Sequence, residues 1–107
     1  MIIKITRSKQ KNKRYAITMD DGKKFDFGYI YGNTYLDHKR KDLRNAYIKR
    51  HMANKTEKTL IDNLVPSPAL FSAYLLWSYG DENITDLEDN IKLLNSLWMK
   101  KKYNKDV

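Results

Sequence analysis

The alternation of apolar and polar positions near the N-terminus predicts a small antiparallel sheet. Residues 2–6 read as a short strand, and the run RYAITM alternates so that Tyr15, Ile17 and Met19 share one face. An Asp-Gly pair follows, which favours a tight hairpin because Gly accepts a positive φ. The run KFDFG then supplies the partner strand. We therefore expect a β-hairpin or meander over about residues 2–28.

The rest of the chain predicts three helices that pack on this sheet, over about residues 36–53, 68–79 and 86–102. Projecting the first helix at about 100° per residue gathers an apolar arc on one side. The arc consists of Leu43, Tyr47, Ile48 and Met52. Arg44 falls inside it, where its stem can cover the core while its head meets a carboxylate. The fold class is accordingly α+β.

The second helix is bounded by strong local signals. Ser67 suits the N-cap, Pro68 the first helical position, and Gly80 the C-terminal stop. The helix is apolar nearly all round, so it is either central or part of an interface. Because a small domain cannot readily surround one helix, its aromatic residues are candidates for contact with a partner, with a plain core as the alternative. These candidates are Phe71, Tyr74, Trp77 and Tyr79.

The third helix has the clearest amphipathic pattern. Its apolar stripe consists of Leu87, Ile91, Leu94, Leu97 and Trp98. The preceding run Thr-Asp-Leu-Glu, from Thr85 to Glu88, fits a capping box. The stretch between the first two helices, residues 54–66, is expected to be a connector with one helical turn.

Length and charge indicate one basic α+β domain spanning residues 1–107. The chain carries a net charge of +8 and has no cysteine, which excludes disulfides, thiolate zinc sites and cysteine nucleophiles. Neither a signal peptide nor an apolar run long enough to span a bilayer is apparent. The protein is therefore expected not to be secreted. Residues 1–19 hold six basic and no acidic residues, whereas residues 59–99 hold one basic and six acidic residues.

The basic half contains the candidate binding residues. They are Arg7, Lys9, Lys11, Lys13, Arg14, Lys39, Arg40, Arg44, Lys49 and Arg50. Tyrosines lie between them along the chain, so the set could hold phosphates and stack bases. The alternative is a solvated surface with tyrosines in the core. Lysine outnumbers arginine, which favours diffuse attraction to an anionic partner over reading of base sequence.

The order of several motifs resembles a family of short, basic, uncharacterised proteins encoded by large nucleocytoplasmic DNA viruses. The motifs are KRYAITMDDGKKFDFG, DHKRKDLRNAYIKRH, a proline followed by LFSAYLLW, and a terminal amphipathic helix that ends in lysines. The resemblance extends from Lys13 to Lys102 and departs from the family pattern at residues 54–66 and 80–83. It implies a viral origin and a role in the virion, so the expected location is the virion or the cytoplasm of the infected cell. It implies no activity.

Catalytic chemistry is weakly indicated. His38 and His51 alone do not make a metal site, because zinc needs further ligands and the chain has no cysteine. No Ser/His/Asp pattern, P-loop or dinucleotide fingerprint is present. The run from Tyr29 to His51 has a partial resemblance to GIY-YIG nucleases, with Arg44 and His51 as counterparts and Glu57 or Glu82 as the carboxylate. The first strand lacks the glycine motif of that class, so no catalytic residue, metal or cofactor is predicted.

These patterns give an ordered set of functional hypotheses. The first is a non-enzymatic structural or interaction protein, a minor capsid-associated component of a virion, whose partners are other virion proteins or nucleic acid. The second is a nucleic-acid-binding protein without sequence preference. The third is a GIY-YIG-like nuclease. No small-molecule substrate is inferred.

Overall fold

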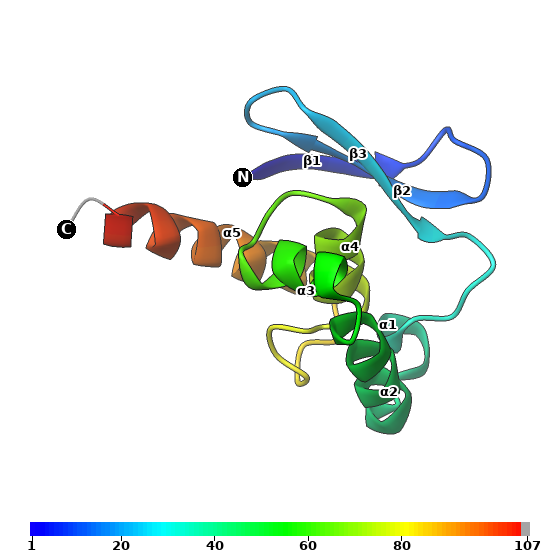
Figure 1. Cartoon of the computed structure of the whole chain (residues 1–107). Coiled ribbons are helices and arrows are strands. Elements are labelled where there is room, and N and C mark those ends of the chain that lie inside the picture. Colours follow the sequence, from blue (N-terminus) through cyan, green and yellow to red (C-terminus); the bar gives the residue numbers. More distant parts are fainter. Residues whose placement is uncertain (106–107) are drawn as a thin grey trace.

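The computed structural model describes residues 1–105, and these begin with a three-stranded antiparallel sheet. The strands are β1 (Ile2–Arg7), β2 (Lys13–Met19) and β3 (Lys24–Tyr29). Their order in the sheet is β1-β2-β3, so β1 and β3 are its two edges. Figure 1 shows the meander above the helices. The predicted hairpin or meander is confirmed.

Alternation decides which face of the sheet is buried. Ile17 and Met19 are 0% and 4% exposed, and Phe27 of β3 is also fully buried. Tyr15 pairs with Phe27 across β2 and β3, and their ring centroids lie 5.8 Å apart. Gly22 has a φ of 87° in the β2–β3 turn, which is the conformation expected of Gly in an Asp-Gly hairpin.

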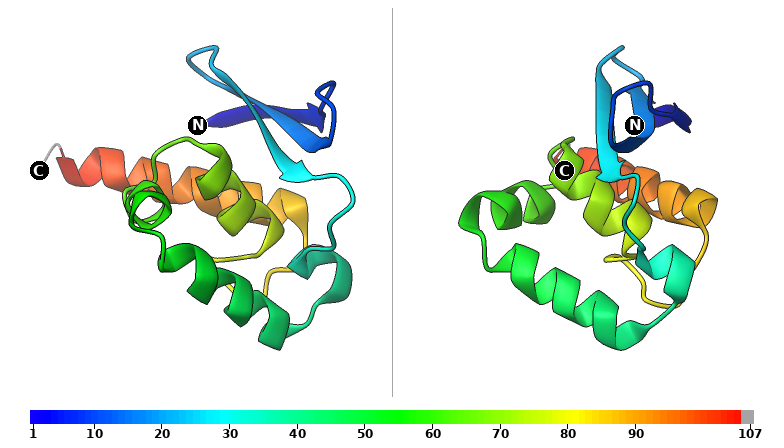
Figure 2. Two further views of the ribbon diagram at one scale, coloured as in Figure 1. Left: turned by 45° about the vertical axis from the view of Figure 1, so that its right-hand side comes forward. Right: turned by 90° about the vertical axis from the view of Figure 1, so that its right-hand side faces the viewer.

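The helices form two further layers beneath the sheet. They are α1 (Tyr35–His38), α2 (Lys41–Met52), α3 (Lys55–Asp62), α4 (Pro68–Phe71), the π-helical segment η1 (Ser72–Leu76) and α5 (Leu87–Lys105). In both views of Figure 2, α4 and α5 lie between the sheet and α2. The α+β class is therefore confirmed. No helix among residues 1–105 combines the length and the apolar character that crossing a membrane requires.

The first predicted helix, residues 36–53, is two helices rather than one. Lys39 has a φ of 57° and ends α1, and the next backbone N–H, that of Arg40, donates to the His38 imidazole at 2.9 Å. This local contact replaces a helical hydrogen bond. In addition, no residue of α2 is fully buried, and Leu43 of the predicted arc is 40% exposed. The connector also holds more helix than predicted, because Asn54 caps the eight-residue α3 by accepting from the Glu57 N–H.

The second predicted helix begins as expected but ends early. The Ser67 hydroxyl accepts from the Leu70 N–H, and Pro68 occupies the first turn. After Phe71 the helix widens into η1, and it ends at Leu76 rather than near Gly80. Ser78, with a φ of 49°, reverses the chain. Tertiary hydrogen bonds to Ser78, described below, account for this stop, and no local sequence signal marks it.

The third predicted helix is confirmed as α5, which extends three residues past the predicted end. Its cap is Asp86, not Thr85, because the Asp86 carboxylate accepts from the N–H groups of Glu88 and Asp89. Leu94 is fully buried. Other members of the predicted stripe pack against the same core. The core thus lies between the sheet, α4 with η1, and α5.

Candidate binding surface

The end of the sheet at the β1–β2 loop gathers half of the predicted basic residues. We call this surface the basic sheet end. It consists of Arg7, Lys9, Lys11, Lys13 and Arg14 with the neighbouring Tyr29, Ile30 and Tyr31. Register places Lys13 beside Tyr29, and the Ile30 N–H donates to the Asn12 carbonyl at 3.1 Å. The loop and the segment after β3 are therefore held together.

Local hydrogen bonds shape the loop that carries these cations. The Ser8 hydroxyl donates to the Asp26 carboxylate at 2.5 Å and accepts from the Gln10 N–H at 3.0 Å. Asn12 has a φ of 66°, a left-handed conformation that asparagine adopts more readily than most residues. A fixed loop holds its lysines close together, which concentrates their positive potential.

Most cations of the basic sheet end have no internal partner. Arg7, Lys9, Lys11 and Lys13 are exposed, and none of them forms an ion pair with a residue in the range 1–105. Arg14 is the exception, because its guanidinium lies 3.2 Å from the Asp37 carboxylate.

The Arg14–Asp37 pair also changes the acidity of the carboxyl group. Partial burial opposes the ionised form of Asp37. Hydrogen bonds from the Thr34 N–H and from Arg14 outweigh burial and hold the pKa of Asp37 below its usual value. At neutral pH the charge of Arg14 is therefore balanced by ionised Asp37. Four cations of the basic sheet end remain without such a partner.

Two exposed aromatic rings lie beside these cations. Tyr29 is 61% exposed and Tyr31 is 77% exposed, and their ring centroids are 5.6 Å apart in an edge-to-face arrangement. A hollow of about 460 Å³ adjoins them, lined by Arg7, Ser8, Lys13, Arg14, Tyr15 and Ile30. Cations and accessible ring faces are the two elements that bind single-stranded nucleic acid without sequence preference.

The other predicted basic residues lie around α1 and α2 and differ in availability. Lys39, Lys49 and Arg50 are exposed, and the part of the chain that the structure describes offers them no ion-pair partner. Arg40 lies 2.8 Å from Asp42, and this bond is the main reason that the pKa of Asp42 is lowered. Three free cations therefore remain here.

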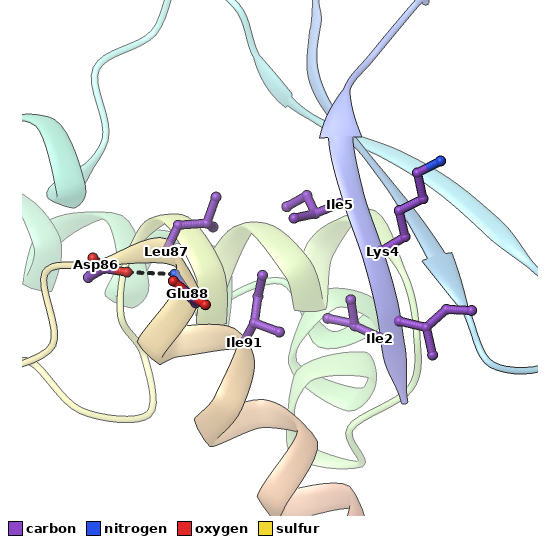
Figure 3. A pocket seen from close by; sticks show the side chains of 8 residues that line it. Ile2, Lys4, Ile5, Asp86, Leu87, Glu88 and Ile91 are labelled. Carbon is purple, nitrogen blue, oxygen red and sulfur yellow. Dashed lines mark hydrogen bonds between the residues drawn. The ribbon is translucent and has the colours of Figure 1, made fainter.

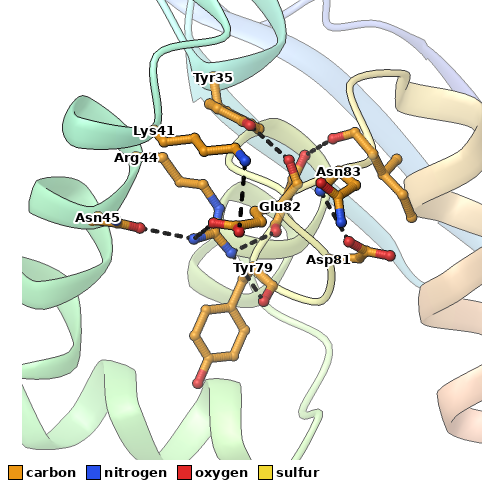
Figure 4. A network of polar contacts seen from close by, with 10 residues as sticks. Tyr35, Lys41, Arg44, Asn45, Tyr79, Asp81, Glu82 and Asn83 are labelled. Carbon is orange, nitrogen blue, oxygen red and sulfur yellow. Dashed lines mark hydrogen bonds and ion pairs between the residues drawn. The ribbon is translucent and has the colours of Figure 1, made fainter.

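Arg44 binds partners inside the fold and is not available to another molecule. Its side chain is only 11% exposed. One terminal nitrogen donates to the Ser78 carbonyl at 2.9 Å, and the guanidinium lies 3.8 Å from the Glu82 carboxylate, which Lys41 also approaches (Figure 4). The expectation of a covered stem and a carboxylate partner is confirmed. The same contacts make Arg44 a structural residue that ties α2 to the segment after η1.

The aromatic candidates of the second helix lie mostly inside the molecule. Phe71 and Tyr74 are 0% and 8% exposed, so in this fold they are core residues with no area for a partner. Trp77 is half-buried and stacks on Tyr47 with 4.1 Å between ring centroids and 6° between planes. Tyr79 is also half-buried and packs edge-to-face on Tyr74. The central position of α4 and η1, between the sheet and α2, explains this burial.

Sequence reasoning missed a cleft between the end of β3 and helices α2 to α4. His51 Nδ1 lies 2.5 Å from the Glu57 carboxylate, and the Tyr47 ring packs against the imidazole at a tilt of 36°, with 4.1 Å between ring centroids. Burial first, and then the charge of Glu57, raises the pKa of Tyr47 to about 12. The sequence analysis did not predict that one helix ends and another begins between positions 51 and 57. This change of direction brings the two positions together.

The residues aligned with GIY-YIG nucleases do not converge. Arg44 meets Glu82, whereas His51, two turns further along α2, meets Glu57, and Tyr31 is exposed. Among the described residues, no group of three or more His, Asp or Glu side chains is arranged to hold a metal ion. This arrangement gives no support to a metal-dependent phosphodiesterase.

Comparison with known proteins gives one family match. Residues 3–51 match the model of a family of unknown function (DUF5754). The match covers nearly the whole sheet, α1 and most of α2. No curated protein and no solved structure matches the chain. The match includes the basic sheet end and assigns no activity to it.

Proposed function

We propose that the protein is a non-enzymatic interaction protein whose basic sheet end docks on an anionic partner. We also propose that it is a minor, capsid-associated component of the virion of a large DNA virus. The observation that carries the first proposal is the set of four exposed cations without partners among residues 1–105, namely Arg7, Lys9, Lys11 and Lys13. The viral setting is supported by the motif resemblance alone.

Electrostatics explains what such a surface does. Several like charges on one fixed loop attract an acidic surface over roughly a Debye length, about 8 Å at physiological ionic strength. Attraction of this kind accelerates association and weakens as salt rises. It needs no deep pocket.

Proteomics of purified particles tests the viral setting. The protein should be found inside washed particles at substantial copy number. If it were found in infected-cell extract and never in particles, a virion role would be excluded, while the docking proposal would still need its own binding test.

Nucleic-acid binding without sequence preference is a second candidate function. The observation that favours it is the exposure of Tyr29 and Tyr31 beside free lysines. Single-stranded DNA should bind, and four phosphate contacts should lower its affinity roughly fiftyfold between about 50 mM and about 200 mM salt. Absence of binding at low salt, or binding that salt does not change, would exclude this function.

Charge-reversal variants separate the surface from the rest of the chain. Lys9→Glu with Lys11→Glu should abolish anion binding at the basic sheet end. The matched control is Lys23→Glu with Lys24→Glu, because these two lysines are also exposed but lie at the β2–β3 turn, at the other end of the hairpin. Equal loss in both proteins would show that net charge, not this surface, controls binding.

A further inference from the structure

The outer edge of β1 is open over its second half. The Ser8 N–H donates to the Arg14 carbonyl at 3.1 Å, which makes these two residues a hydrogen-bonded pair. Such pairs alternate along an antiparallel ladder. In the register of β1 and β2, Ile5 lies opposite Ile17 and Arg7 lies opposite Tyr15. These two are therefore non-hydrogen-bonded pairs. Their backbone N–H groups point away from β2, toward the free edge.

The first half of the same edge is already covered. A bulge between Ile2 and Lys4 turns the Ile2 backbone outward. There the Asn95 side chain of α5 accepts from the Ile2 N–H at 2.9 Å and donates to the Ile2 carbonyl at 3.2 Å. The Asn95 side chain thus makes the two hydrogen bonds that a neighbouring strand would make to Ile2. The open edge begins after this residue.

An apolar groove runs beside this edge. It has a volume of about 510 Å³ and is lined by Ile2, Ile3, Lys4, Ile5, Asp86, Leu87, Glu88 and Ile91. Figure 3 shows Ile2 and Ile5 of β1 facing Leu87 and Ile91 of α5 across it. The apolar core therefore reaches the surface between an unpaired strand and a helix.

Acidic residues line one side of the groove, although the protein as a whole is basic. Asp86 and Glu88 line its α5 side and are both exposed. Lys4 is the one basic residue among the lining. A guest would meet apolar walls, backbone donors and a negative rim.

From this geometry we infer that the open edge of β1 is a docking site for an extended segment of another protein, which adds to the sheet as a fourth strand. Its backbone pairs with Ile5 and Arg7, and alternate apolar side chains enter the groove. A lysine or arginine of the guest meets Glu88. The open edge meets the basic sheet end at Arg7, but it uses the Arg7 backbone N–H, whereas the proposed function uses the Arg7 side chain and the loop lysines. The two proposals are therefore tested by different variants and can fail separately.

Selection from a displayed library of linear peptides of about seven residues tests the site. The expected winners alternate apolar residues and carry Lys or Arg. Winning peptides should slow hydrogen exchange at the Ile5 and Arg7 amides. Winners without this alternation, or protection elsewhere on the protein, would overturn the inference.

Two kinds of variant sharpen the result. N-methylation of the peptide amides that face β1 should abolish binding, because the strand pairing needs those donors. Glu88→Lys should weaken binding by about fivefold, since charges at a binding rim have modest effects. The control Asp89→Lys reverses an exposed charge in the same turn outside the groove, and it should leave binding unchanged.

Sedimentation of the protein alone tests whether a second copy occupies the edge. A monomer at all accessible concentrations supports a foreign guest. A stable dimer that Arg7→Pro dissociates would assign the edge to a second copy and would overturn the inference as stated. Proline is suited to this test because it removes an outward N–H while an edge strand tolerates it.

Discussion

The basic sheet end and the surroundings of Arg44 use similar residues in opposite ways. Both combine arginine or lysine with tyrosine and lie within the region of densest positive charge. At the sheet end, Arg7 and its neighbouring lysines face solvent without partners among residues 1–105. Around Arg44, the guanidinium binds Ser78 and Glu82 and lies 5.9 Å from the centre of the Tyr35 ring.

The difference shows that a count of charges does not reveal which charges are available. Arg44 is on the same helix as Lys49 and Arg50, yet it stabilises the fold while they remain exposed. Availability depends on whether a distant carbonyl or carboxylate reaches the head group. Substitutions in the two regions should therefore affect different measurements: stability around Arg44, and binding at the sheet end.

Leu94→Ala sets the scale for a buried residue. Leu94 is fully buried on α5, so its truncation should lower the free energy of unfolding by about 2–5 kcal/mol. Lys9→Ala at the sheet end should change it by less than about 0.5 kcal/mol. Urea unfolding followed by circular dichroism measures both. An unchanged midpoint for Leu94→Ala would mean that α5 does not pack as described.

Arg44→Met should cost about 2–3 kcal/mol of unfolding free energy, because the buried Ser78 carbonyl loses a charged donor. Arg40→Met is the matched control on the same segment. Its pair with Asp42 is exposed, so its loss should cost clearly less than the loss of Arg44. Equal effects in the two variants would contradict the distinction between a buried arginine and an exposed one. Thermal unfolding monitored in parallel provides a second measurement.

The same contrast explains which parts could be predicted from the sequence. Strand alternation, the Asp-Gly turn, the Ser67 cap and the α5 stripe are local signals, and the elements they indicate are present. The break at Lys39 depends on the His38 imidazole, and the early end of η1 depends on groups distant in sequence. Arg44 takes the Ser78 carbonyl, Asn90 donates to the Ser78 hydroxyl, and that hydroxyl donates to the Ile84 carbonyl.

The candidate site was predictable to a similar degree. Composition located the basic half, but it could not separate Arg14 and Arg44, which have internal partners, from Arg7 and the loop lysines. It also gave no sign that the aromatic residues of the second helix would be covered. A helix that is apolar all round fits a core and an interface equally well, and only the layer order decides. The open edge of β1 required knowledge of register.

Tyr29→Ala with Tyr31→Ala should separate the two kinds of anionic partner. If single-stranded DNA stacks on both rings, the double variant should lose about 2–4 kcal/mol of binding free energy, a factor of roughly thirty or more. Binding to polyglutamate, which has no bases, should change little. Both rings are largely exposed, so unfolding should also be nearly unaffected. Fluorescence anisotropy with the two labelled probes measures the difference, and equal losses for both would argue against stacking.

Asp37→Asn should have the smallest effect. It removes the ion-pair partner of Arg14 and so leaves this cation available for binding. Because the pKa of Asp37 is lowered in the folded state, ionised Asp37 adds stability that is fully present above its unfolded pKa of about 3.8 and is lost as pH falls through the folded value. The variant should therefore be less stable than the wild type at neutral pH, and the gap should close in acid.

The pair is partly exposed, so the loss at pH 7 should stay below about 1 kcal/mol. The freed Arg14 should strengthen anion binding at the basic sheet end and steepen its dependence on salt, since one more cation can meet a phosphate or carboxylate. Unfolding curves at pH 3 and pH 7, combined with salt titrations, measure both effects. A variant that loses stability at pH 7 without any gain in anion affinity would show that Arg14 lies outside the binding surface.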